Sequence, residues 1–293
     1  MLKVFIAVIL TITSFFSGVK YAIVKPPALN DGGIRVHYAE GASNYMDIYL
    51  PEDLSGTKDI VFAVHGGAWA LGDQTMFTRY AKRAAGLGFV GVTVDYSKTP
   101  DKATARTMVD EIQTALTVLK KELAARGIQT DRMMFFGHSA GAHISLLYAY
   151  TRLGECPFPI GYVAALSPPA DLTLEAGGKT VIERSRSTLL TLLTGENITN
   201  RTIKTDKGRA AVAAVNPIEH VRPGVPPTLI AQGNADEMVP YENALRLFEK
   251  LKANGVACEL VTMDGQKHFL SRAPQEMQDH LLQRLLKWAE LYL

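Results

Sequence analysis

The chain has 293 residues, of which 47% are hydrophobic and 20% are charged, so it can bury a large core and is not a disordered protein. Its 31 Lys and Arg residues nearly balance its 29 Asp and Glu residues, and the formal net charge of +2 gives no sign of the concentrated basic face that nucleic acid requires. Two cysteines, Cys156 and Cys258, cannot form a disulfide scaffold or a cysteine-based four-ligand zinc site.

Residues 1–18 have the layout of a secretory signal peptide. Lys3 precedes an apolar run from Val4 to Phe16, which is followed by the small residues Ser17 and Gly18. The run is shorter than the ~20 residues that span a bilayer. We therefore expect a secreted or periplasmic protein with no stable membrane span after processing. An uncleaved membrane anchor and a buried N-terminal element are the alternatives.

Strand-like and helix-like patterns alternate after residue 34. Strands are expected over residues 34–39, 45–50, 59–64, 89–94, 133–136, 162–166, 227–231 and 258–263. Helices are expected over residues 75–87, 102–125, 140–150, 241–253 and 275–293. Several of the strands are apolar throughout, which is typical of a parallel sheet covered by helices on both faces, so the fold class is α/β.

Residues 172–215 interrupt this alternation. The segment contains a Gly-Gly pair, many threonines and a helical pattern near Thr188–Leu193. It is too short to have a core of its own, so we interpret it as an insertion over the sheet and residues 19–293 as a single domain.

A G-x-S-x-G motif joins an apolar run to a predicted helix at Gly137–Gly141. That context places Ser139 on a tight strand-to-helix turn, where small neighbours allow a strained backbone and expose the hydroxyl group. The start of the helix also favours negative charge near the serine. An ordinary turn with Ser139 as a helix N-cap is the alternative interpretation.

A serine nucleophile needs a base and an acid that orients the base. His268 is the best candidate base among seven histidines, because it follows the last predicted strand in a glycine-containing loop. Asp236 follows the preceding strand in a similar loop, and Glu237 and Asp264 are its rivals. The chain order Ser139, Asp236, His268 is the order expected for this motif.

An oxyanion site is predicted at the segment His65-Gly66-Gly67-Ala68-Trp69. Glycines there allow backbone N–H groups to approach a reacting carbonyl. The N–H of Gly67 or Ala68 would act together with that of Ala140. An ordinary glycine turn is the alternative.

Together these segments resemble the α/β-hydrolase superfamily, and more narrowly its HGG-containing esterase and lipase group. The resemblance rests on HGGAW, GHSAG, GNADEMVP and the loop of His268, and it extends over residues 34–293. It implies a mostly parallel eight-stranded sheet with Ser139 as nucleophile, His268 as base and Asp236 as orienting acid. The chain has HGGA where the group often has HGGG, and Asp95-Tyr96-Ser97 where the group often has DYR.

The sequence thus predicts a serine carboxylesterase that acts on a small-molecule ester of small or medium size without a metal or organic cofactor. An amidase, arylformamidase-like or peptidase-like hydrolase with the same triad is one alternative, and a non-catalytic binding protein is another. A disulfide between Cys156 and Cys258 is not expected, because one intervening strand would place them about 9–10 Å apart, beyond the ~7 Å that a disulfide tolerates.

Overall fold

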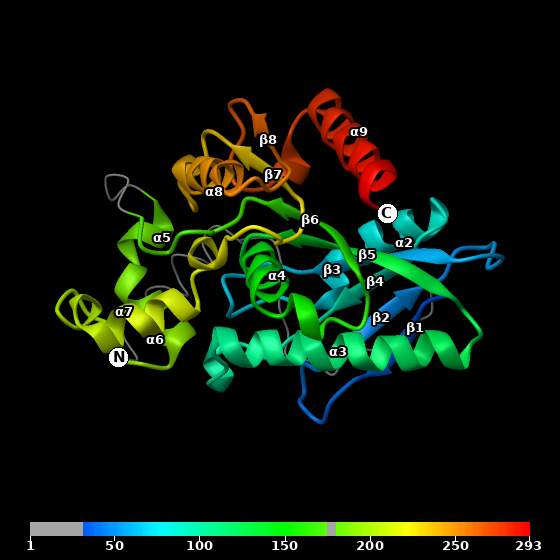
Figure 1. Cartoon of the computed structure of the whole chain (residues 1–293), viewed down its shortest axis with the longest axis horizontal. Coiled ribbons are helices and arrows are strands. Elements are labelled where there is room, and N and C mark those ends of the chain that lie inside the picture. Colours follow the sequence, from blue (N-terminus) through cyan, green and yellow to red (C-terminus); the bar gives the residue numbers. More distant parts are fainter. Residues whose placement is uncertain (1–31, 175–179) are drawn as a thin grey trace.

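The structure is a computed structural model that describes residues 32–174 and 180–293. The predicted signal peptide over residues 1–18 lies outside the described residues. Eight strands form one sheet in the order β1-β2-β4-β3-β5-β6-β7-β8 (Figure 1). The strands are β1 (Ile34–His37), β2 (Tyr45–Tyr49), β3 (Lys58–Val64), β4 (Val90–Val94), β5 (Thr130–His138), β6 (Ile160–Leu166), β7 (Thr228–Gly233) and β8 (Cys258–Met263).

Strand pairing confirms the mostly parallel eight-stranded sheet. β1 pairs antiparallel with β2, and β2 pairs antiparallel with β4. Every pairing from β4 through β3 to β8 is parallel. Because the carboxyl ends of parallel strands meet at one edge, the loops after β3, β5, β7 and β8 are brought together there.

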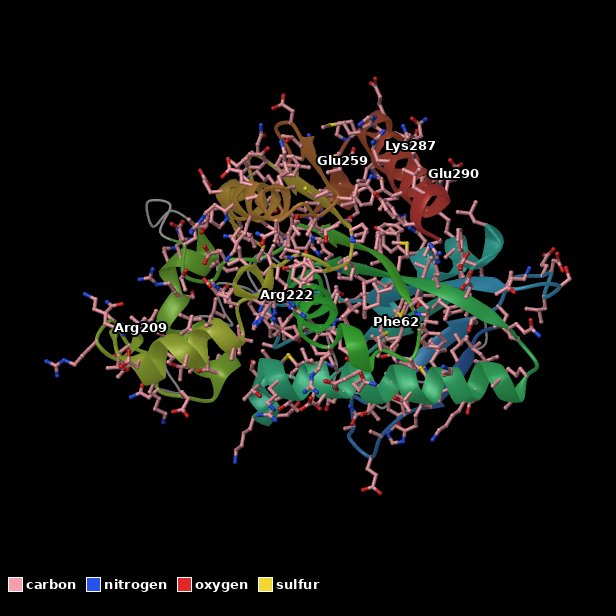
Figure 2. All side chains as sticks on the ribbon, in the orientation of Figure 1. Phe62, Arg209, Arg222, Glu259, Lys287 and Glu290 are labelled. Carbon is pink, nitrogen blue, oxygen red and sulfur yellow. The ribbon has the colours of Figure 1, made fainter. Side chains whose placement is uncertain are left out.

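Helices cover both faces of this sheet. The described helices are α2 (Thr78–Gly86), α3 (Ala105–Ala125), α4 (Ala140–Thr151), α5 (Val181–Arg184), α6 (Arg186–Thr194), α7 (Asp206–Ala214), α8 (Tyr241–Ala253) and α9 (Gln275–Tyr292). Successive side chains of β3 point to opposite faces of the sheet. Phe62 packs in a core with α3, α4 and α8, whereas Ala63 packs in a core with α9. Figure 2 shows Phe62 in the interior, between the sheet and α3.

Two helices begin later than predicted, for local reasons. Residues 74–77 form a 3-10 turn, because the Asp73 carboxylate accepts a hydrogen bond from the Thr75 N–H, so α2 starts only at Thr78. Lys102 has a left-handed backbone and Thr104 caps the next helix, so α3 starts at Ala105 instead of residue 102.

The segment between β6 and β7 is more helical than predicted. It contains α6 near the expected helical pattern, and also α5 and α7. α7 carries little sequence signal because its only buried residues are Gly208 and Val212. Its exposed Arg209 extends into solvent at the outer end of the segment (Figure 2).

One buried polar cluster joins the two ends of this segment. The Asn216 side chain donates a hydrogen bond to the Asp171 carboxylate at 3.3 Å and accepts one from the Leu172 N–H at 2.9 Å. Asn243 of α8 accepts a hydrogen bond from the Asp171 N–H at 2.6 Å, and Arg246 pairs with the Asp171 carboxylate at 2.5 Å. The two ends of the segment are therefore held together by this cluster.

Cys156 and Cys258 are unpaired in the structure, and β7 lies between β6 and β8, the strands that begin near these cysteines. Within the described residues, no helix is long and apolar enough to cross a membrane.

Candidate active site

Ser139 lies on a strained turn between β5 and α4. Its backbone angles, φ 55° and ψ −124°, lie in a region that a non-glycine residue rarely adopts. Ser139 occupies the N-cap position of α4, but its side chain makes no capping hydrogen bond to the helix, so capping does not account for this serine. The hydroxyl group is instead directed toward another residue.

The two motif glycines allow the close packing that this turn needs. A methyl group on Gly141 would lie 2.1 Å from the Val64 carbonyl oxygen, and one on Gly137 would lie 2.7 Å from the Ala142 Cα. Both neighbours are backbone atoms, so a larger residue at either position would displace the turn.

A continuous hydrogen-bonded chain joins the three predicted triad residues. The Ser139 Oγ lies 2.9 Å from His268 Nε2, and His268 Nδ1 lies 2.7 Å from Asp236 Oδ2. All three residues are buried, with exposed fractions of 9% for Ser139, 3% for His268 and 7% for Asp236. The structure thus brings together the three residues that the sequence singled out, in the loops after β5, β7 and β8.

The Asp236 carboxylate is held by three donors besides His268. Its Oδ1 accepts hydrogen bonds from the Met238 and Val239 N–H groups at 2.8 and 2.9 Å. Its Oδ2 accepts a hydrogen bond from the buried Gln232 amide at 2.7 Å. Sequence reasoning missed Gln232, which precedes the acid by four residues and so gives no spacing signal of its own.

The two rival carboxylates are engaged elsewhere. Glu237 forms an ion pair with Lys267 at 2.7 Å, and Asp264 accepts a hydrogen bond from Asn234 at 2.7 Å. Asp236 is therefore the carboxylate that contacts the imidazole.

The main chain of His268 is clamped by two side chains. Its carbonyl oxygen accepts hydrogen bonds from His138 Nε2 and from Ser167 Oγ, both at 3.0 Å. Burial and, to a lesser degree, the neighbouring His268 lower the pKa of His138 to about 4. His138 therefore stays neutral near pH 7 and adds no charge beside the triad.

The predicted oxyanion loop has the backbone of a tight turn. Gly67, Ala68 and Trp69 have φ values of 124°, 53° and 58°. A methyl group on Gly67 would lie 2.0 Å from the Leu71 carbonyl oxygen, so glycine is required there. Gly66 lies against the nucleophile, since a methyl group on it would be 3.2 Å from Ser139 Cβ.

Trp69 anchors this loop to α4. Its indole Nε1 donates a hydrogen bond to His143 Nδ1 at 3.2 Å, and His143 Nε2 donates to the Val215 carbonyl oxygen at 2.8 Å. This pattern fixes a neutral His143 with its proton on Nε2. Burial lowers the pKa of His143 to about 4, in keeping with that tautomer.

The depressed pKa of His143 predicts a loss of stability in acid. In the unfolded chain this imidazole takes up a proton near pH 6.5, but in the folded protein it does so only near pH 4. Between these values the unfolded state holds more protons, so the free energy of unfolding falls as the pH falls, by about 1.4 kcal/mol per pH unit. Urea titrations at pH 6 and pH 4.5 should give a smaller fall for His143→Gln than for the parent. Equal falls would contradict this assignment.

An apolar pocket opens beside the serine hydroxyl. It is lined by Ala68, Trp69, Ser139, Val181, Ile182, Ser185, Leu189, Met238 and Val239. α5 is attached to the loop of Asp236, because the N–H groups of Val181 and Ile182 donate to the carbonyl oxygens of Glu237 and Met238, both at 3.1 Å. The segment between β6 and β7, interpreted from the sequence as an insertion over the sheet, thus supplies a wall of the pocket.

Comparison with known proteins identifies the family. The model of the BD-FAE family, an α/β-hydrolase esterase family, matches residues 46–251. The chain belongs to the BD-FAE family. The match includes the oxyanion loop, Ser139 and Asp236, and the predicted resemblance to α/β-hydrolase esterases is confirmed.

Curated relatives of this BD-FAE family member are described as esterases. A probable isoprenylcysteine alpha-carbonyl methylesterase of Oryza sativa subsp. japonica is 26% identical over 272 residues, which are 86% of this chain and 61% of the relative. The probable carboxylic ester hydrolase LipM of Mycobacterium tuberculosis is 27% identical over 235 residues, which are 76% of this chain and 52% of the relative. The chain therefore spans less than two thirds of the length of either relative.

Solved structures confirm the fold of this BD-FAE family member. Thermogutta terrifontis esterase 2 phosphonylated by sarin superposes with a TM-score of 0.71 at 21% identity, over 90% of this chain and 98% of that chain. Esterase B from Lactobacillus rhamnosis superposes with a TM-score of 0.74 at 20% identity, over 98% of this chain and 95% of that chain.

Proposed function

We propose that the protein is a serine hydrolase that cleaves carboxylic esters of small or medium size through an acyl-enzyme intermediate. The observation that carries this proposal is the hydrogen-bonded chain from Ser139 through His268 to Asp236, which opens on an apolar pocket. The esterase family and the named esterases among the relatives support the same reaction class.

The first half of the reaction forms the acyl-enzyme. Ser139 Oγ attacks the ester carbonyl carbon while His268 Nε2 takes the hydroxyl proton. Asp236 stabilises the imidazolium that forms and keeps Nδ1 protonated in the resting state. The tetrahedral oxyanion is bound by the N–H groups of Gly67 or Ala68 and of Ala140. The intermediate then expels the alcohol, which receives the proton from His268 Nε2.

The second half of the reaction returns the enzyme to its starting state. His268 Nε2 accepts a proton from a water molecule, whose oxygen attacks the acyl carbon. A second oxyanion forms in the same site and collapses, which releases the carboxylic acid and returns the proton to Ser139 Oγ. Each bond broken is matched by a bond formed, and no redox partner is involved.

The pocket beside Ser139 favours a modest apolar acyl group. Its lining includes the aliphatic side chains of Val181, Ile182 and Leu189, together with the Trp69 ring. An extra methylene that fits such a pocket contributes about 1–3 kcal/mol to binding in the transition state, so acyl length should govern selectivity.

Matched substrates test the reaction class. We expect turnover of p-nitrophenyl butyrate to exceed that of butyryl p-nitroanilide, and a fluorophosphonate probe to label one serine per chain, located at Ser139 by peptide mapping. Preferred cleavage of the anilide would favour the amidase alternative. Absence of labelling together with absence of hydrolysis would favour a binding protein.

We also propose that the protein is exported. The proposal is supported by the charged start and the short apolar run of residues 1–18. N-terminal sequencing of protein recovered from the extracellular or periplasmic fraction should give a start after the apolar run, whereas an intact Met1 would contradict cleavage.

A further inference from the structure

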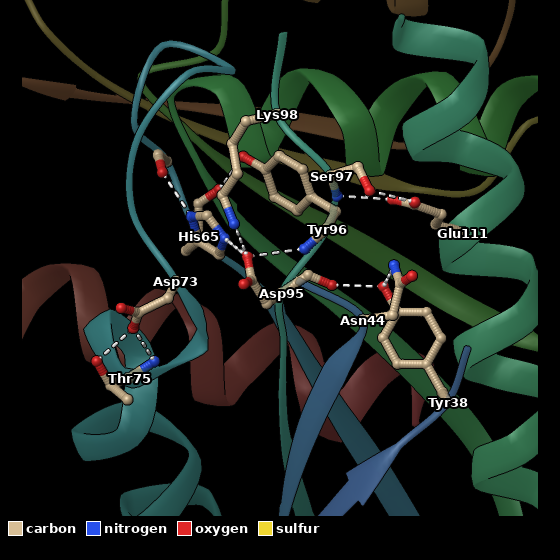
Figure 3. A network of polar contacts seen from close by, with 11 residues as sticks. Tyr38, Asn44, His65, Asp73, Thr75, Asp95, Tyr96, Ser97, Lys98 and Glu111 are labelled. Carbon is tan, nitrogen blue, oxygen red and sulfur yellow. Dashed lines mark hydrogen bonds and ion pairs between the residues drawn. The ribbon is translucent and has the colours of Figure 1, made fainter. Parts of the chain in front are cut away.

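His65 is buried at the base of the oxyanion loop, and both of its ring nitrogens face oxygen atoms. Nδ1 lies 2.6 Å from the Gly66 carbonyl oxygen, and Nε2 lies 2.8 Å from Asp95 Oδ1 (Figure 3). The side chain has no exposed surface. A neutral imidazole has one N–H and one lone pair, and a lone pair directed at a carbonyl oxygen is repulsive. Both contacts are favourable only when both nitrogens carry protons.

The surroundings of His65 suit such a cation. Asp95 Oδ1 also accepts hydrogen bonds from the Tyr96 N–H at 2.8 Å and from the ammonium group of Lys98, which marks it as an ionised carboxylate. The Tyr96 ring stacks on the imidazole with centroids 4.4 Å apart and planes 10° apart, and its hydroxyl donates to the His65 carbonyl oxygen at 2.8 Å. An aromatic face attracts a cation, so Tyr96 adds to the stabilisation by Asp95.

The Gly66 carbonyl and the Gly67 N–H belong to the same peptide group. A hydrogen bond to the carbonyl oxygen of an amide polarises that amide and makes its N–H a stronger donor. The protonated Nδ1 of His65 therefore acts directly on the N–H that we assign to the oxyanion.

The other two candidate donors are polarised in the same way, but by neutral groups. The Gly67 carbonyl oxygen, which shares a peptide with the Ala68 N–H, accepts from the Ala70 and Leu71 N–H groups at 3.0 and 2.9 Å. The Ser139 carbonyl oxygen, which shares a peptide with the Ala140 N–H, accepts from the His143 N–H at 3.0 Å. Of the three peptides, the one between Gly66 and Gly67 receives a hydrogen bond from a charged side chain.

We propose that His65 is held as a doubly protonated imidazolium that polarises the Gly66–Gly67 peptide and thereby strengthens the Gly67 N–H as a donor to the oxyanion. His65 acts as a positioning residue, since it acts through the peptide, and Asp95 keeps it charged and oriented. The effect of His65 on the oxyanion rests on the proposed ester hydrolysis. The protonation state of His65 does not depend on that function.

NMR of the protein labelled with nitrogen-15 in its histidine rings tests the protonation state of His65 directly. Near pH 8, we expect one buried histidine to carry protons on both ring nitrogens, and its signals to disappear in His65→Gln. They should remain in Lys98→Met, because this variant removes a competing cation and keeps Asp95. A His65 with a single ring proton in the parent would overturn the proposal. Because this NMR measurement needs no substrate, its result remains valid even if the protein does not hydrolyse esters.

Kinetics of the same variants test the effect on the oxyanion. We expect His65→Gln to lower kcat about 10- to 100-fold, less than the 10²–10³-fold loss typical of removing a donor outright, with little change in KM. Affinity for a trifluoromethyl ketone, which forms an oxyanion on Ser139, should fall by the same factor as kcat/KM. Unchanged affinity for the ketone would overturn the proposal. If His65→Gln does not fold, Asp95→Asn takes its place, and loss of the second ring proton together with weaker ketone binding is expected.

Discussion

Replacement of Ser139 by alanine is expected to lower kcat for a short-chain p-nitrophenyl ester by about 10⁶, the loss typical of removing a serine nucleophile. The reason is that Ser139 Oγ is the hydroxyl oxygen in hydrogen-bond contact with His268 Nε2, so the substitution removes the atom that we propose as the nucleophile. The fold should stay intact, because the Ser139 side chain does not cap α4. Initial rates and thermal melting of parent and variant provide the two measurements.

Ser145 supplies a matched control on the helix that follows Ser139. Its hydroxyl is buried and donates to the Gly141 carbonyl oxygen at 2.8 Å, away from the triad. We expect Ser145→Ala to retain turnover within a few fold. Survival of hydrolysis within tenfold of the parent in Ser139→Ala would rule out the acyl-enzyme mechanism.

Replacement of Asp236 by asparagine is expected to lower kcat by about 10⁴. An amide at this position accepts from His268 less strongly and can stabilise the wrong imidazole tautomer, so Nε2 is no longer available to take the serine proton. The buried site that holds two N–H donors on Oδ1 should keep the side chain in place. Single-turnover release of p-nitrophenol measures the loss in the acylation step.

Substitution of Asp264 tests whether another carboxylate near His268 could orient the imidazole in place of Asp236. It lies in the loop that precedes His268, and its Oδ1 accepts from the exposed Asn234 side chain. Asp264→Asn should leave kcat within about twofold of the parent. A larger loss in Asp264→Asn than in Asp236→Asn would reassign the orienting acid.

The sheet and most helices could be predicted because hydrophobic periodicity reports burial. β4 is buried at every position, and its continuous apolar run is a clear strand signal. β5 begins at Thr130, earlier than the predicted start at residue 133. The prediction missed this start because the exposed, charged Asp131 and Arg132 carry no apolar signal. Burial patterns therefore locate the middle of a strand better than its ends.

The triad could be predicted because each member follows a strand, and parallel strands bring these positions to one edge. Most of the supporting contacts could not, since they join residues that lie far apart along the chain. His65 and Asp95 are 30 residues apart and meet only because β3 and β4 are paired. Ser167 likewise reaches His268 only because the sheet brings their loops together, whereas Gln232 lies four residues before Asp236 in a spacing that carries no signal of its own.

The cluster of Asp171 and Asn216 has a consequence for the segment that lines the pocket. Both ends of the intervening segment are fastened at this point, so the segment projects from the sheet as one loop with closely spaced ends. Its residues Val181, Ile182 and Leu189 line the pocket beside Ser139, and the backbone of Val181 and Ile182 also holds the loop of Asp236, so this segment shapes the pocket and supports the acid at the same time.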